Sequence, residues 1–263
     1  METLTVRGVP YALERTGRGE PVLLAHCLTW NHHDYDPIVA SLAAEYDCIV
    51  PDQRGHGGTG FPTEPYSLAD MAEDLYDLLQ QLGVGPVHYV GHSMGAMMGP
   101  FLALAHPEVL RSMTLIGGSA EAEDEARLAG YRQLVAAVRA GQAAAVAERL
   151  VGLFFSERSR RVRPEAVARY KADFLASDPE GLYWTAEAVF TRPNLLPRLS
   201  EIAVPTLVVV GEQDVVTPLA QAQALAEGLA DARLLVVPES GHFTTVEAPA
   251  TLAGALRDFW AGL

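Results

Sequence analysis

The chain has 263 residues, of which 49% are hydrophobic, and this is enough to bury the core of one α/β domain that carries an insertion. Its formal net charge is −14 at pH 7, which argues against binding to nucleic acid or to an anionic membrane surface, because phosphate contacts need clustered cations. Lys171 is the only lysine, which excludes P-loop chemistry and nearly all Schiff-base chemistry.

The cysteines and the apolar runs bear on the cellular compartment. Cys27 and Cys48 are the only cysteines and do not form a disulfide framework, so a reduced, cytoplasmic protein is expected. Residues 1–7 lack the basic flank and the apolar stretch of a signal peptide. No uninterrupted apolar run reaches the roughly 18 residues that span a bilayer. We therefore expect no membrane segment, and both a monomer and a homodimer stay open.

The first part of the chain alternates short apolar strands with helices. In chain order we expect strands at 4–7, 11–15 and 22–25, a helix at 37–46, a strand at 48–51, a helix at 67–82, a strand at 87–90, a helix at 94–105 and a strand at 112–116. The helix that follows Ser67 is the clearest, because Ser67 is a good N-cap, the apolar positions have helical spacing, and Gly83 and Gly85 end it.

The alternation then stops, and residues 120–195 are helical in pattern throughout. Helices are expected at 121–140, at 146–155, and after each of the prolines Pro164 and Pro179. Strands at 206–210 and 233–237 then alternate with helices at 219–229 and 250–260. This predicts an α/β fold with a mostly parallel sheet, in which 1–119 and 196–263 form the core and 120–195 form a helical cap inserted after the sixth strand.

One pentapeptide carries the clearest chemical signal. Residues 91–95 (Gly-His-Ser-Met-Gly) lie between a predicted strand and a predicted helix, so Ser93 is expected on a sharp turn with its hydroxyl outward. A serine hydroxyl needs a general base and an orienting acid to act as a nucleophile. Asp214 and His242 each follow a later parallel strand, in the order Ser, acid, His. All three are expected at one edge of the sheet.

The acid has alternatives that the sequence leaves open. Glu212 lies two residues before Asp214, and Asp214 has the alternative role of capping the helix that follows Thr217. Residues 117–119 (Gly-Gly-Ser) follow the preceding predicted strand, at 112–116, and include no carboxylate. This favours Asp214 as the acid.

Four segments together resemble the α/β-hydrolase fold family over essentially the whole chain. They are 52–57 (Asp-Gln-Arg-Gly-His-Gly), 91–95, 211–214 (Gly-Glu-Gln-Asp) and 240–243 (Ser-Gly-His-Phe). The resemblance implies that Ser93 is the nucleophile, His242 the general base, and Asp214 the residue that orients His242. It also implies an oxyanion hole made by the backbone N–H groups of Met94 and Leu28. At 26–28 this chain has His-Cys-Leu where family members usually have His-Gly, and enol-lactonase-like members also depart from His-Gly there.

The function implied is that of a cofactor-free serine hydrolase that cleaves a small carboxylic ester or lactone through an acyl-serine, as in esterases and lactonases. The same triad also supports C–C bond hydrolysis, thioester hydrolysis or perhydrolysis, and a non-catalytic ligand-binding protein on this fold stays an alternative. No cofactor and no metal ion are expected. Residues 55–60 match G-x-G-x-x-G formally, but the prolines at 62 and 65 follow where a dinucleotide site needs a helix.

Several histidines receive other interpretations. The run 32–36 (His-His-Asp-Tyr-Asp) has no metal-site spacing and is interpreted as a solvated loop near the pocket mouth. His92 and Trp30 are expected in the pocket wall. His26 and His56 are expected to hold loops by hydrogen bonds.

Overall fold

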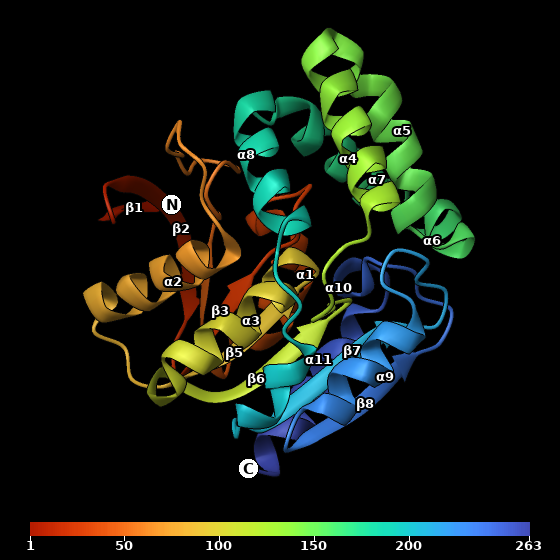
Figure 1. Cartoon of the computed structure of the whole chain (residues 1–263). Helices are drawn as coiled ribbons and strands as arrows, with labels where there is room; N and C mark the ends of the chain where they lie inside the picture. Colours follow the sequence, from red (N-terminus) through yellow and green to blue (C-terminus); the bar gives the residue numbers. More distant parts are fainter.

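The computed structural model describes all residues 1–263 and is built around one eight-stranded sheet (Figure 1). The strands are β1 (Glu2–Val6), β2 (Val9–Gly17), β3 (Glu20–Ala25), β4 (Tyr46–Pro51), β5 (Val87–His92), β6 (Leu110–Ile116), β7 (Thr206–Gly211) and β8 (Ala232–Val237). Their order in the sheet is β1-β2-β4-β3-β5-β6-β7-β8. β2 is antiparallel to both β1 and β4, and the other neighbours are parallel. The mostly parallel sheet that the sequence predicts is confirmed.

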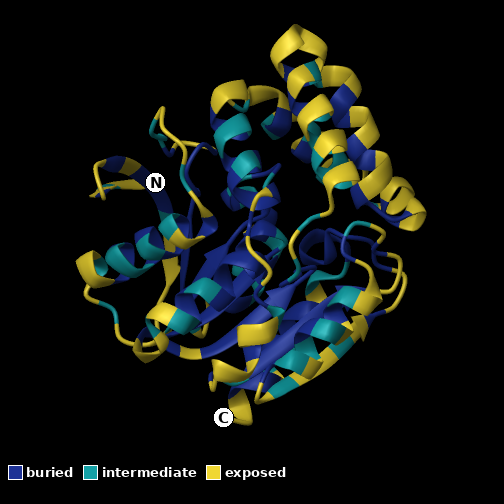
Figure 2. Cartoon of the chain, in the orientation of Figure 1, coloured by how far each residue is buried: buried dark blue, intermediate teal, exposed yellow.

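Helices cover both faces of the sheet. One face packs against α2 (Leu68–Leu82), α3 (Met94–Ala105) and α9 (Leu219–Gly228), and the other against α1 (Asp36–Leu42) and α11 (Pro249–Ala261). On β3, Leu23 belongs to the first cluster, whereas Val22 and Leu24 belong to the second, as the strand period of two requires. Figure 2 shows the sheet buried between exposed helical surfaces. Burial on both faces explains why the strands are continuous apolar runs.

Helix α2 forms as its sequence predicts. Ser67 accepts a hydrogen bond from the backbone N–H of Asp70, and the Asp70 carboxylate accepts one in return from the Ser67 N–H. This capping box satisfies N–H groups that the first helical turn leaves free. At the other end Gly83 takes the left-handed conformation, with φ 62°, and ends the helix.

Five helices lie between β6 and β7 and stand above the sheet as a separate group (Figure 1). They are α4 (Glu125–Ala137), α5 (Ala143–Phe154), α6 (Glu157–Val162), α7 (Pro164–Ala176) and α8 (Pro179–Phe190). Their inner sides form an apolar cluster with residues of the core, among them Trp30 and Phe243. The helical insertion after the sixth strand is thus present. No helix of the structure combines the length and the apolar character needed to cross a membrane.

Some boundaries differ from those predicted. The helix expected at 37–46 ends at Leu42, because the chain must turn to enter β4 at Tyr46. The helix expected at 121–140 starts at Glu125, because Asp124 caps it by accepting from the N–H of Arg127. Short elements without a clear period were not predicted: α6, α10 (Thr244–Glu247), and the 3₁₀ helices η1 (His32–Tyr35), η2 (Pro107–Val109) and η4 (Leu196–Glu201). The last residues of the helix expected at 121–140 belong to a short π-helix, η3 (Val138–Gln142), that directly follows α4.

Candidate active site

Ser93 lies on the turn between β5 and α3, where the sequence places it. Its backbone has φ 52° and ψ −106°, a conformation that residues with a side chain rarely adopt. The turn is held by a hydrogen bond of 2.8 Å from the Ser93 N–H to the carbonyl of Ile116 at the end of β6. Strain of this kind persists only where the surrounding structure enforces it, and it often occurs at functional sites.

The two glycines that flank Ser93 explain why the turn can be so tight. A Cβ atom at Gly91 would lie 2.4 Å from the backbone of Gly95, and one at Gly95 would lie 2.0 Å from the carbonyl oxygen of Ala25. Both distances are far below van der Waals contact, and both neighbours are backbone atoms that cannot swing away. The close approach of α3 to β3 therefore requires hydrogen as the side chain.

We predict that Gly95→Ala destabilises the protein by about 3 kcal/mol or more, at the upper end of the usual range for overpacking. Gly85→Ala is the matched control, since a Cβ there meets nothing within 4 Å, and we expect a change of no more than about 0.5 kcal/mol. Urea unfolding of both variants measures the difference. Equal midpoints for the two variants would contradict the packing argument.

Asp214 and His242 meet at the same edge of the sheet. The Nδ1 atom of His242 lies 2.8 Å from Oδ2 of Asp214. The Asp214 carboxylate also accepts from the N–H groups of Val216 and Thr217, at 2.8 and 3.0 Å, and from the Thr217 hydroxyl. Burial raises the pKa of Asp214, but the His242 ring and these donors outweigh it, so the net shift is downward. An ionised Asp214 holds the Nδ1 proton of His242 and leaves Nε2 free for chemistry.

Two contacts that the sequence did not reveal fix this pair. A Cβ atom at Gly117, whose φ is 56°, would lie 3.2 Å from the His242 ring and 3.3 Å from Asp214, so a small residue there gives the pair its space. The His242 N–H donates to the carbonyl of Phe154 at the end of α5, at 2.8 Å. The histidine is therefore tied to the helical insertion as well as to the sheet.

Ser93 and His242 line the same cavity, whose volume is about 60 Å³. Fourteen of its 20 lining residues are hydrophobic. Helices α4, α5 and α8 supply half of the wall: Arg127, Tyr131, Leu134, Val135, Leu150, Phe154, Leu182, Ala186, Val189 and Phe190. No hydrogen bond joins Ser93 Oγ to the ring of His242 here, and nucleophile–base contacts of this kind often tighten only when substrate binds.

The loop after β3 presents the backbone N–H of Leu28. The ring of His26 accepts from the Gln53 N–H through Nε2, so its Nδ1 carries the proton and donates to the Cys27 carbonyl at 2.7 Å. Because the peptide is trans, the Leu28 N–H points away from that carbonyl. Both nitrogens of the His56 ring lie at hydrogen-bond distance from carbonyl oxygens, Nδ1 from that of Arg54 and Nε2 from that of Leu28. His26 and His56 thus hold loops by hydrogen bonds, as predicted.

The two predicted oxyanion-hole residues, Leu28 and Met94, differ in their position relative to the cavity. Leu28 lines the cavity, and its N–H has no hydrogen-bond partner within the protein. Met94 is not among the residues that line the cavity. It is fully buried directly after Ser93, as the first residue of α3, where backbone N–H groups are free of helical bonds.

Two sequence interpretations are wrong. His92 and Trp30 do not line this cavity: His92 is hydrogen-bonded to Asp34, and Trp30 packs on Tyr170 and Phe243. The run 32–36 is not a solvated loop, since His32, Asp34 and Tyr35 are buried. Its polar composition hid this burial, because the partners that satisfy Asp34 lie far along the chain.

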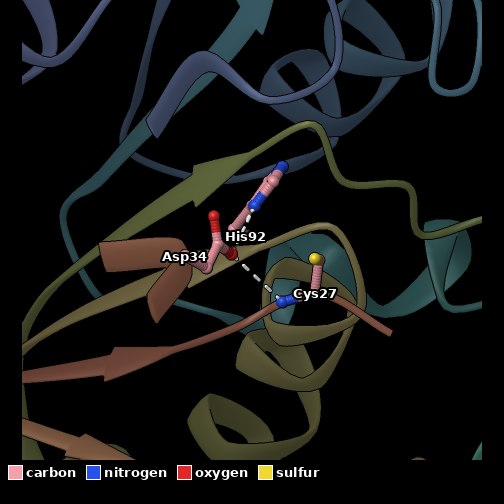
Figure 3. Close-up of side chains that lie close together, drawn as sticks. All are labelled: Cys27, Asp34 and His92. Atoms are coloured by element: carbon pink, nitrogen blue, oxygen red, sulfur yellow. Dashed lines mark hydrogen bonds and ion pairs between the residues drawn. The ribbon is translucent and has the colours of Figure 1, made fainter. Parts of the chain in front are cut away.

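Cys27, Asp34 and His92 form a buried cluster, shown in Figure 3. Their candidate ligand atoms lie within 4.8 Å of one another. Both oxygens of Asp34 and both nitrogens of His92 are already engaged in hydrogen bonds within the protein. Burial raises the pKa of the Cys27 thiol, and a protonated thiol is a poor metal ligand. The donor set therefore fits a hydrogen-bond network better than a metal ion.

The fold and the site together define an enzyme of the hydrolase class. A family model described as alpha/beta hydrolase fold matches residues 20–249, and the chain belongs to this family. It is 28% identical over 250 residues to 3-oxoadipate enol-lactonase 2 of Acinetobacter baylyi, covering 94% of this chain and 92% of that protein. It is 27% identical over 253 residues to 2-(acetamidomethylene)succinate hydrolase of Mesorhizobium japonicum, covering 92% and 88%. A thermophilic esterase from Thermogutta terrifontis, solved with malate bound, superposes with a TM-score of 0.93 at 27% identity, covering 99% and 98%.

Proposed function

We propose that this protein is a cofactor-free serine hydrolase that cleaves a small carboxylic ester or lactone through an acyl-serine intermediate. The protein is a hydrolase of ester-type bonds, as its relatives named enol-lactonase and esterase are. The observation that carries the finer proposal is the buried Asp214–His242 hydrogen bond of 2.8 Å beside the cavity that also contains Ser93.

The proposed mechanism follows from the positions of these groups. Ser93 Oγ attacks the carbonyl carbon while His242 Nε2 takes the hydroxyl proton, and Asp214 stabilises the imidazolium that forms. The N–H groups of Leu28 and Met94 stabilise the oxyanion. Collapse breaks the bond to the alcohol oxygen, which receives the proton from His242. Water then attacks the acyl-serine with His242 again as base, and the carboxylic acid leaves.

We also propose that two parts of the chain have different roles in the reaction. Residues 1–119 and 196–263 form the catalytic core, and residues 120–195 form a cap that selects the substrate. This is supported by the cavity wall, half of which comes from α4, α5 and α8, while Ser93 and His242 come from the core. The mostly apolar wall favours an uncharged acyl or alcohol group.

Labelling with a fluorophosphonate tests the proposal, because the reagent phosphonylates only an activated serine. We expect one adduct per chain, located on Ser93 by mass spectrometry of peptides, and a burst of p-nitrophenol from p-nitrophenyl acetate equal to one per active site. A chain that hydrolyses this ester without any label on Ser93 would contradict the acyl-serine mechanism.

The size of the cavity predicts the acyl preference. The cavity beside Ser93 is small, with a volume of about 60 Å³, and half of its wall comes from helices α4, α5 and α8. We expect kcat/KM for p-nitrophenyl acetate and butyrate to exceed that for the laurate ester at least about tenfold, which corresponds to about 1.4 kcal/mol of transition-state binding. Initial rates over the ester series measure this. A laurate ester that is turned over as fast as acetate would show that the cap opens widely.

A further inference from the structure

Asp34 is not one of the groups that carry out the proposed reaction, yet its carboxylate is fully buried and takes part in three hydrogen bonds. It lies in η1, and both Asp34 and His92 have 0% of their surface exposed. Oδ2 of Asp34 lies 2.7 Å from Nδ1 of His92 and accepts from the Cys27 N–H at 3.3 Å. Oδ1 accepts from the hydroxyl of Thr245 at 2.6 Å.

The hydrogen bonds define the protonation of His92. Its Nε2 lies 2.9 Å from the carbonyl oxygen of His242, which can only accept, so Nε2 carries a proton. Its Nδ1 faces a carboxylate that already accepts from two other donors. The ring therefore donates from both nitrogens, and an imidazolium faces a carboxylate. Burial lowers the pKa of His92, but the Asp34 charge outweighs it and the net shift is upward.

The hydrogen bonds of Asp34 and His92 connect this pair to each segment that carries a group of the proposed active site. Cys27 precedes Leu28, whose N–H is the proposed oxyanion donor. His92 directly precedes Ser93 on the turn. The carbonyl of His242 and the hydroxyl of Thr245 belong to the segment that carries the general base. Figure 3 shows Asp34 between His92 and the backbone of Cys27.

We propose that Asp34 and His92 act as one positioning unit that sets the relative placement of Ser93, His242 and the Leu28 N–H. This inference rests on the proposed function, since it assigns the unit to that reaction. The three segments lie at or directly after the ends of β3, β5 and β8, which are far apart in the sequence. A misplacement of about 1 Å between reacting groups costs on the order of 100-fold in rate. The pair thus acts through the groups it holds and does not touch the substrate.

The test compares Asp34→Asn, His92→Gln and the double variant. Each single change removes the charge of one partner of the ion pair and keeps the approximate shape of that side chain. We expect each to lower kcat about 100-fold with KM changed by less than about threefold, as expected when geometry and not binding is lost. Rates are normalised to the sites that the fluorophosphonate titrates, so that unfolded protein does not count. The double variant should be no slower than the slower single variant, because the two residues act as a unit.

Asp47→Asn is the matched control. Asp47 is a buried carboxylate paired with Arg15 at 2.6 Å, but it lies at the amino end of β4, away from the site. We expect this variant to keep the kcat of the unmodified protein even if its thermal midpoint falls. Loss of kcat in proportion to lost stability in all variants would show a merely structural role and overturn the inference.

Two further variants allow the proposal to be tested even if the Asp34 variant does not fold, and separate it from the proposed function. Thr245→Val removes only the hydroxyl that Oδ1 accepts from, so it tests the unit even if the Asp34 variant does not fold. A lower kcat at unchanged KM and unchanged thermal midpoint supports the inference, and an unchanged kcat overturns it. Ser93→Ala separates the two proposals. If Ser93→Ala stays active, the proposed function fails, whereas an inactive Ser93→Ala beside fully active Asp34 and His92 variants rejects the positioning unit alone.

Discussion

Ser93→Ala is expected to lower kcat for p-nitrophenyl butyrate by at least about 10⁴-fold while the protein stays folded. The change removes the only oxygen that forms the acyl bond in the proposed mechanism. Alanine accepts the strained turn at φ 52° about as well as serine does, so the elbow and the cavity stay intact. Steady-state kinetics of the purified variant, with its unfolding curve, measure the effect.

The control is Ser41→Ala. Ser41 lies on α1, where its hydroxyl donates to the carbonyl of Pro37, and it has no contact with the cavity. We expect its kcat to equal that of the unmodified protein. If Ser93→Ala retains more than about a tenth of the activity while Ser41→Ala is unaffected, Ser93 is not the nucleophile, and the acyl-serine pathway is wrong.

Asp214→Asn is expected to lower kcat about 10³- to 10⁴-fold, with a much smaller change in KM. The amide cannot hold the Nδ1 proton of His242 as the carboxylate does at 2.8 Å. The histidine then carries its proton on Nε2, where it cannot act as a base toward Ser93. The decrease in kcat therefore reports on the tautomer of His242. Steady-state rates at saturating substrate measure kcat and separate this effect from a change in substrate binding.

Glu212→Gln is the matched control for Asp214→Asn. Glu212 is the other carboxylate of the same loop, but it is exposed and accepts from the N–H of Glu239. We expect its loss to leave kcat unchanged. The reverse result, an active Asp214 variant and an inactive Glu212 variant, would mean that the orienting acid has been assigned to the wrong position in this loop.

The local features of the site were predictable because they depend on neighbours in the sequence. The tight turn at Ser93 is encoded by a strand, two glycines and a helix within a short stretch, and the capping box of α2 lies within four residues. Asp214 and His242 were placed at one edge because parallel strands end there. Their hydrogen bond of 2.8 Å is in the structure. The catalytic roles of these residues stay predictions for the experiments above.

The interpretation of residues 32–36 failed for a physical reason. A polar run with two adjacent histidines has the composition of a solvated loop, and nothing local contradicts that. Burial of Asp34 becomes favourable only when its charge is paired and hydrogen-bonded. The partners that do this are His92, 58 residues away, and Thr245, 211 residues away. No window of the sequence contains them together.

The sequence by itself determined the alternation of strands and helices, the helical insertion and the turn that presents Ser93, since each depends on periodicity or on steric limits between neighbouring residues. The tertiary structure alone decided which polar groups are buried, which ring nitrogens carry protons, and how the loops of β3, β5 and β8 meet around Asp34. These properties depend on the desolvation and pairing of groups that only folding brings into contact.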